Sequence, residues 1–194
     1  MIFQACLMSQ TMVLEHSDLL AACRRGDSEA LRELFEVHRD RVYSIALRFC
    51  GNESAAMDIA QDTFVKLFAS IGSFRGEAAL QTWIYRLVVN RCFDYGRRAS
   101  RYVPLADGVL ATLRASADAL GDMLRRETYA SVRSAVELLS PQHRMAVVLR
   151  YTDGLSYEGI AKVLNCSPGT VASRLNRAHK ALESKLAPLG ERHA

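Results

Sequence analysis

The stretch NCSPGTVASRLNRAHKAL, from Asn165 to Leu182, places a proline and a glycine directly before a run with helical periodicity. Asn165 tolerates the left-handed conformation that closes a helix, and Ser167 is a residue type that caps the next one. Pro168 suits the first helical position, where no backbone donor is needed. With the short helix expected over 156–164, this pattern predicts a helix, a tight turn and a second helix.

The helix predicted after this turn, over residues 167–186, has one apolar and one polar face. Helical spacing brings the apolar residues together on a face that we expect to be buried, formed by Val171, Leu175, Ala178 and Leu182. The opposite face combines two cations and two hydrogen-bonding side chains with no acid, and comprises Gly169, Ser173, Asn176, Arg177 and Lys180. Such a face suits a recognition helix that enters the major groove of DNA.

Individual side chains of the polar face suit different DNA atoms. Asn176 and Arg177 could read base edges, whereas Ser173 and Lys180 could reach bases or phosphates. Arg150, at the end of a preceding helix, is a further candidate contact. A solvated basic helix in an ordinary bundle would carry a similar face, but the capped turn and the small-residue helix before it favour DNA binding.

The rest of the chain is also expected to be helical, because Pro and Gly are sparse and apolar residues recur at helical spacing. We predict helices over about 31–49, 60–71, 78–96, 120–139 and 141–153. Periodicity is lost around Pro104 and Gly108. The predicted fold is therefore all-α, with two helical domains at 18–101 and 120–190 joined by a flexible linker at 102–119, and a helix-turn-helix in the second domain.

Composition excludes several classes of protein. The 194 residues are 49% apolar and 24% charged with a net charge of +4, which suits a globular protein. No run approaches the roughly 18 apolar residues of a membrane span, and the N-terminus makes a poor signal peptide, so we expect a cytoplasmic protein without membrane insertion. The five cysteines lack metal-ligand spacing. Without paired carboxylates beside a histidine or a phosphate-binding loop, we expect no catalytic residues, no metal and no cofactor.

Two blocks of the sequence resemble a known family. The stretch LSYEGIAKVLNCSPGTVASRLNRAHKAL (155–182), preceded by LSPQHRMAVVLRYTDG (139–154), closely resembles region 4 of bacterial sigma factors of the extracytoplasmic function (ECF) group. The stretches DIAQDTFVKLF (58–68) and FRGEAALQTWIYRLVVNRCFDYGRR (74–98) resemble region 2 of the same group. The resemblance covers roughly residues 22–186 in the expected order.

This resemblance implies a promoter-specificity subunit of RNA polymerase. Region 4 would read the −35 element as duplex, and region 2 would bind the polymerase core and then melt and hold the −10 element. An anti-sigma factor would be a further partner, because such proteins are commonly held inactive by one. The residues predicted to contact the −35 element are Arg150, Ser167, Thr170, Ser173, Arg174, Asn176, Arg177 and Lys180.

Region 2 carries two further predicted surfaces. In the helix over 78–96, basic residues alternate with an aromatic side chain, and this combination suits binding of single-stranded DNA. The predicted −10 set is Arg86, Asn90, Arg91, Asp94, Arg97, Arg98 and Arg101, of which Asn90 and Asp94 could read Watson–Crick edges.

The preceding predicted helix carries an acidic patch that includes an apolar residue, and such a patch suits a protein partner. By resemblance that partner is the clamp helices of the largest polymerase subunit, and the predicted contacts are Asp58, Gln61, Asp62 and Val65.

Two residues depart from the family pattern, since Ala172 stands where Lys or Arg is usual and Gly159 where Glu is common.

A helix-turn-helix regulator that binds an operator without polymerase remains an alternative. It explains residues 141–186 but leaves the acidic patch and the helix over 78–96 without a role. A stable complex with the polymerase core would exclude it.

Overall fold

The computed structural model describes residues 18–74, 76, 79–102 and 120–190, where all regular structure is helical, as predicted. The N-terminal domain contains α2 (Ser28–Cys50), α3 (Glu53–Ser70), a short 3-10 helix η1 (Ile71–Ser73) and α4 (Leu80–Tyr102). The C-terminal domain contains α5 (Leu120–Glu137), α6 (Pro141–Tyr151), α7 (Tyr157–Leu164) and α8 (Pro168–Gly190). Apart from its first residue, the predicted linker at 102–119 lies outside the described residues.

Local capping chemistry sets the helix boundaries of the N-terminal domain. Asp27 begins α2 by accepting a hydrogen bond from the backbone N–H of Glu29 at 2.9 Å. Gly51 ends this helix with a left-handed φ of 69°. Asn52 then caps α3 by accepting a hydrogen bond from the N–H of Ala55 at 2.9 Å. The Gly51-Asn52 pair therefore ends one helix as predicted and also begins the next.

One predicted boundary is wrong, and another is correct without the expected capping bond. The helix α4 continues to Tyr102, because Gly96 lies within it beside the ring of Phe49 instead of ending it. At the start of α6, Pro141 occupies the first turn as expected, but the Ser140 side chain makes no capping hydrogen bond. Gly96 therefore does not mark a helix end where packing favours a continuous helix, whereas Ser140-Pro141 marks a helix start even without a side-chain cap.

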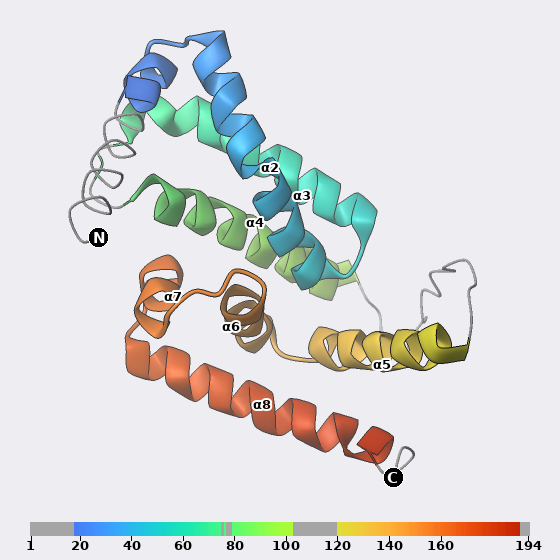
Figure 1. Cartoon of the computed structure of the whole chain (residues 1–194). Coiled ribbons are helices and arrows are strands. Elements are labelled where there is room, and N and C mark those ends of the chain that lie inside the picture. Colours follow the sequence, from blue (N-terminus) through green and yellow to red (C-terminus); the bar gives the residue numbers. More distant parts are fainter. Residues whose placement is uncertain (1–17, 75, 77–78, 103–119, 191–194) are drawn as a thin grey trace, which may run out of the picture.

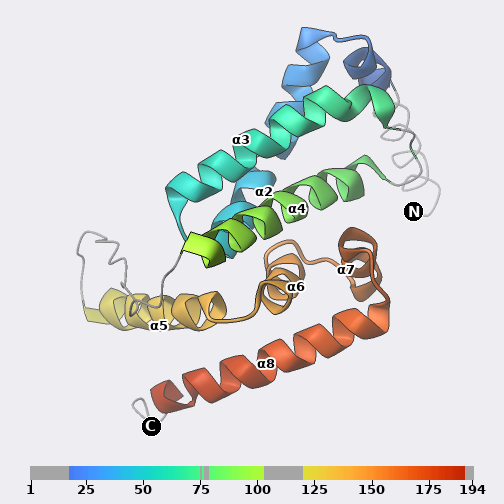
Figure 2. The same cartoon turned by 180° about the vertical axis from the view of Figure 1, so that it is seen from behind.

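The two domains pack against each other through α4, α6 and α7. Figures 1 and 2 show α6 and α7 lying between α4 above and α8 below, while α2 and α3 cover the other side of α4. One continuous cluster of buried apolar side chains includes Phe49 and Val88 from the N-terminal domain and Leu149 and Leu175 from the C-terminal domain. None of the helices in the described ranges is long and apolar enough to cross a membrane.

The cysteines of the described residues are unpaired. Cys23 and Cys92 are buried, as expected for small hydrophobic side chains, whereas Cys50 and Cys166 are half-buried. Burial raises the pKa of the Cys92 thiol, so this side chain stays protonated in the hydrophobic core. Cys6 lies outside the described residues.

Candidate nucleic-acid interface

The turn between α7 and α8 has the geometry that its sequence predicts. Ser156 caps α7 by accepting a hydrogen bond from the N–H of Gly159 at 3.1 Å, so half of the capping box survives without the usual Glu. Asn165 closes α7 in the left-handed conformation, with φ 49° and ψ 54°. Ser167 accepts from the N–H of Thr170 at 3.1 Å, and α8 begins at Pro168. These features form a helix-turn-helix.

The two faces of α8 separate as predicted. Val171, Leu175 and Ala178 are buried against the rest of the C-terminal domain, whereas Leu182, also expected to be buried, is half-buried against the same core. The opposite face is exposed to solvent along the N-terminal half of the helix, and comprises Gly169, Ser173, Asn176, Arg177 and Lys180. Because α8 lies at the outer edge of the molecule (Figure 1), this face is open to a large partner such as duplex DNA.

The other predicted −35 residues instead make contacts within the C-terminal domain. The hydroxyls of Ser167 and Thr170 lie 2.9 Å apart and bond each other at the start of α8. The Arg174 guanidinium donates to the Cys166 sulfur at 3.8 Å. Arg150 donates to the carbonyl of Leu155 at 2.8 Å, and its guanidinium lies 5.5 Å from the centre of the Tyr157 ring. These side chains stabilise the turns that orient the exposed face of α8.

The predicted −10 residues lie along α4, where several are held by neighbours. Asp94 pairs with Arg91 at 3.6 Å and with Arg97, which reduces its freedom to read a base. Arg86 donates to the backbone carbonyl of Lys162 in α7 at 3.0 Å. Asn90 and Arg98 are exposed, whereas the Arg101 side chain lies outside the described residues. Within this set, Asn90 and Arg98 are therefore the most accessible to DNA.

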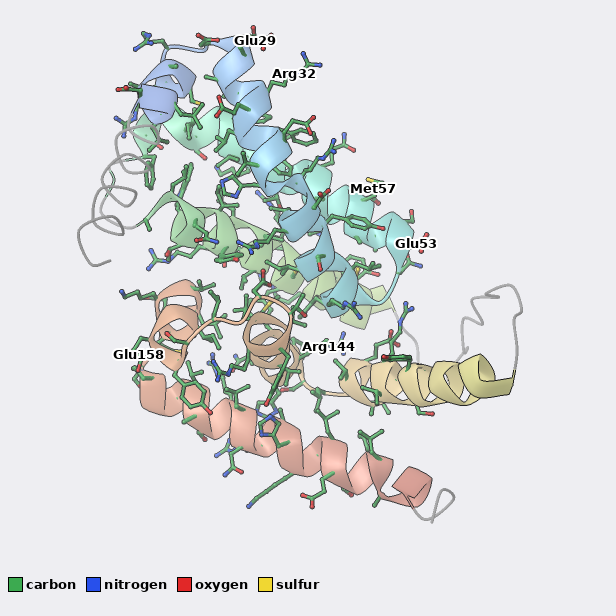
Figure 3. The ribbon with its side chains drawn as sticks, viewed as in Figure 1. Glu29, Arg32, Glu53, Met57, Arg144 and Glu158 are labelled. Atoms are coloured by element: carbon green, nitrogen blue, oxygen red, sulfur yellow. The ribbon has the colours of Figure 1, made fainter. Side chains whose placement is uncertain are left out.

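The outer face of α3 presents the predicted polymerase-binding side chains together. Asp58, Gln61, Asp62 and Val65 are all exposed, and Val65 is 61% exposed although it is apolar. The prediction missed Met57, which is 60% exposed one helical turn before Gln61 and points away from the molecule (Figure 3). Its spacing of four residues from Gln61 was the available signal. An apolar pair rimmed by acids suits a protein surface as partner.

A second missed pair joins α6 to α8. The hydroxyl of Tyr151 and Nε2 of His179 lie 2.8 Å apart, and both side chains are exposed. His179 lies three residues after Asn176, at the edge of the outward face of α8.

Among the described residues, no group of three His, Cys, Asp or Glu side chains is arranged to hold a metal ion.

Comparisons with known proteins match both domains. Residues 34–102 match the family described as Sigma-70 region 2, and residues 129–182 match Sigma-70, region 4. The RNA polymerase sigma-H factor of Pseudomonas aeruginosa is 34% identical over 184 residues, covering 90% of this chain and 95% of that protein. The ECF RNA polymerase sigma-E factor of Escherichia coli K12 is 34% identical over 180 residues, covering 88% and 94%.

Solved structures have the same fold. CnrH in complex with the cytosolic domain of CnrY has a TM-score of 0.65 at 24% identity, covering 88% of this chain and 96% of that chain. RpoE in complex with the anti-sigma factor NepR, from Bartonella quintana, has a TM-score of 0.62 at 26% identity, covering 80% and 96%.

These matches include the N-terminal domain as well as the helix-turn-helix, so an operator-binding regulator without polymerase is not favoured. The similarity to the sigma-H and sigma-E factors extends over most of both chains and is strong enough to decide the family. The chain belongs to the ECF group of sigma factors, which direct RNA polymerase to specific promoters at the start of transcription.

Proposed function

We propose that the C-terminal domain (120–190) reads the −35 element as duplex DNA with the outward face of α8. The observation that carries this proposal is the exposure of Ser173, Asn176, Arg177 and Lys180 on one face of the helix that follows the capped turn. An α-helix fits the major groove, and amide and guanidinium groups pair with adenine and guanine edges there. Among the −35 set, these four residues are the candidates for direct DNA contact.

The N-terminal domain (18–101) has two roles in this proposal. The exposed α3 face with Met57, Asp62 and Val65 binds the clamp helices of the largest polymerase subunit. The basic side of α4, including Asn90 and Arg98, holds the −10 element after it has been melted. Basic side chains and an amide along one helix suit single-stranded DNA. The basic side chains neutralise phosphates, and the amide can bond to an extruded nucleobase.

The relatives also suggest how the protein is controlled. RpoE of Bartonella quintana was solved with the anti-sigma factor NepR, and CnrH with the cytosolic domain of CnrY. We propose that this chain is likewise inhibited by an anti-sigma factor. Its place of action is the cytoplasm, where the polymerase supplies the catalysis and this chain supplies promoter recognition.

In vitro transcription tests the whole proposal. The chain and the polymerase core would be incubated with a promoter library randomised at both the −35 and the −10 element, and transcripts would be sequenced. We expect two enriched motifs that appear only when both proteins are present. If the chain bound one motif without polymerase and supported no transcription, the operator-binding alternative would replace this proposal.

A further inference from the structure

An exposed hydrogen bond joins α6 to α8 beside the outward face of α8. The hydroxyl of Tyr151, the last residue of α6, lies 2.8 Å from Nε2 of His179. The centres of the two rings are 5.8 Å apart, and their planes are tilted by 57°. Tyr151 is 65% exposed, and His179 is exposed as well. The contact therefore holds an imidazole in a fixed orientation at the surface, where a binding partner can reach it.

The other ring nitrogen of His179, Nδ1, bonds to none of the described residues. A neutral imidazole carries its proton on one nitrogen, whereas an imidazolium carries a proton on both. The Tyr151 hydroxyl can donate to an unprotonated Nε2 or accept from a protonated one, so it suits either state. When Nε2 accepts from Tyr151, and also when the ring is an imidazolium, Nδ1 carries a hydrogen. His179 then offers a free N–H donor, which suits an acceptor such as a phosphate oxygen.

His179 lies on the flank of α8 next to Asn176. At 3.6 residues per turn, the two side chains are about 60° apart around the helix axis, and Arg177 is about 160° from His179. When a helix lies in the major groove, the centre of its outward face meets base edges, and its flanks meet the phosphate backbones that wall the groove. The bond to Tyr151 keeps the imidazole on this flank. Phosphate is therefore the DNA group that fits His179.

The charges around His179 come from α8 and from three helices packed against it. Along α8, Lys180 and Glu183 are exposed neighbours of opposite charge. The helices packed against α8 are α5, α6 and α7. The Arg150 side chain of α6 is turned to the Leu155 carbonyl, and on α5 Arg133 pairs with Glu137. The remaining titratable side chains described on these three helices, besides Tyr151, are Tyr129, His143, Arg144, Tyr157, Glu158 and Lys162. Of all these groups, Tyr151 is the one that bonds to the His179 ring.

We propose that His179 binds a backbone phosphate of the −35 duplex through its Nδ1–H, and that Tyr151 is the positioning residue that holds the ring. This inference rests on the proposed function, because it requires the outward face of α8 to enter the groove. Histidine ordinarily changes its charge between about pH 5 and pH 8. The contact is a hydrogen bond when the ring is neutral and an ion pair when it is protonated, and the phosphate favours the protonated ring. The contribution of His179 to promoter affinity therefore increases as pH falls.

Four substitutions separate this role from a purely structural link between α6 and α8. His179→Gln keeps polar atoms at the site but cannot titrate, and His179→Arg keeps a positive charge at every working pH. Tyr151→Phe removes only the hydroxyl. His143→Gln is the matched control, because His143 lies in the first turn of α6, roughly 12 Å along the helix from Tyr151 at about 1.5 Å per residue.

Each full-length variant would be combined with polymerase core, and fluorescence anisotropy would give its affinity for a promoter duplex recovered from the transcription library. We expect the affinity ratio of the original chain to His179→Gln to rise at least about threefold from about pH 8 to about pH 6. One neutralised phosphate steepens the dependence of log affinity on log salt by about 0.9. This difference in slope should separate the two proteins at the lower pH and vanish at the higher pH. His179→Arg should show the steep slope at both.

Tyr151→Phe should weaken binding at both pH values while keeping a pH response, because the imidazole remains but is less well oriented. His143→Gln should follow the original chain throughout. Original affinity in Tyr151→Phe would overturn the positioning role. A pH-independent ratio with equal salt slopes for His179→Gln would overturn the phosphate contact and leave the pair as a link between two helices.

A changed −35 sequence preference in His179→Gln would also overturn the proposal, since phosphate contacts carry no sequence information. The same pH response lost in His143→Gln would assign the effect to histidines in general and not to this flank. Failure of the proposed function is recognisable separately, because the original chain with core would then bind the promoter duplex no better than one with a scrambled −35 element. Circular dichroism of each variant would verify that it remains helical.

Discussion

Arg177 and Ala172 illustrate how single residues of α8 shape the expected DNA preference. Arg177 is exposed on the outward face, with no acid among the residues that share this face. Ala172, where the resemblance to the family leads us to expect Lys or Arg, is half-buried at the edge of the same face. With no long side chain at 172, we expect base reading to depend more heavily on Asn176 and Arg177. The −35 motif of this protein should therefore depend strongly on those two positions.

Substituting Arg177 tests this dependence. We expect Arg177→Ala to weaken binding to the −35 duplex by about 1–3 kcal/mol and to relax the preferred base at one position, as for loss of a bidentate base contact. Lys185→Ala, which removes an exposed cation from another side of α8, is the control for general charge loss. Affinities would be measured by fluorescence anisotropy at fixed salt. Equal effects of the two substitutions would argue against base reading by Arg177.

Asp62 provides the corresponding test on α3. Asp62→Ala should weaken binding to polymerase core several-fold and leave binding to −35 DNA unchanged, because the acid lies on the exposed face opposite the buried residues of that helix. Asp40→Ala is a suitable control, since the Asp40 side chain is 94% exposed on a different helix. Titration of labelled core with each variant would show the difference. A loss shared by both variants would reflect net charge alone.

At the scale of the element, α7 contains a glycine that its conformation does not require. Gly159 has an ordinary helical φ, and a Cβ added there would lie 3.5 Å from the Ser156 hydroxyl and 3.6 Å from the Leu155 Cβ, which are normal contacts. Gly154 differs, because its φ of 65° is left-handed although its surroundings are open. An alanine at 154 therefore tests backbone strain, whereas an alanine at 159 tests whether a side chain fits sterically.

Alanine at these two positions should have opposite effects. Gly159→Ala should raise the free energy of unfolding by up to about 1 kcal/mol through helix propensity. Gly154→Ala should lower it by about 1 kcal/mol, because a side chain is strained in the left-handed region. Urea unfolding followed by circular dichroism would measure both changes. Destabilisation by Gly159→Ala would show that α7 needs the glycine for a reason other than its backbone.

At the scale of the whole molecule, Asp153 makes the packing of the two domains depend on pH, because it contacts Tyr85 and Arg41 of the N-terminal domain. Burial raises the pKa of its carboxyl above the ordinary 3.8, against the opposing effects of the Tyr85 hydroxyl and Arg41. A carboxyl whose pKa is raised by this packing favours the packed arrangement when it is protonated. Its contribution to packing is full below the ordinary pKa and is lost as pH rises through the pKa in the packed structure. Tyr85, with a pKa raised to about 12 by burial and by Asp153, does not titrate in this range.

We therefore expect the radius of gyration to decrease as pH is lowered toward the ordinary carboxyl pKa of 3.8. Asp153→Asn keeps an oxygen acceptor for Tyr85 but cannot titrate, so this variant should lose the part of the response that Asp153 causes. Scattering curves for both proteins at matched ionic strength would test this. An identical response in the variant would assign the pH effect to other groups.

The sequence predicted the helices and the turn well, because their signals are local. Asn165, Ser167 and Pro168 lie within a few residues of the groups that they cap, so their chemistry can be recognised without a structure. The packing of the two domains could not be predicted, because Tyr85 and Asp153 are 68 residues apart and no local pattern links them. Helical periodicity shows which face of α4 is buried but not which helix covers it. For that reason the bond between Arg86 and Lys162 was also missed.

The carbonyls at the end of α2 make hydrogen exchange in its last turn sensitive to domain packing. The N–H of Gly51 bonds to the carbonyl of Leu47 at 2.9 Å. The neighbouring carbonyls of Phe49 and Gly51 accept hydrogen bonds from Arg144 and Arg133 of the C-terminal domain. When the domains separate, this final turn loses its external support and frays more readily. Deuterium uptake at this turn would then report how often the two domains separate, without any label or substitution.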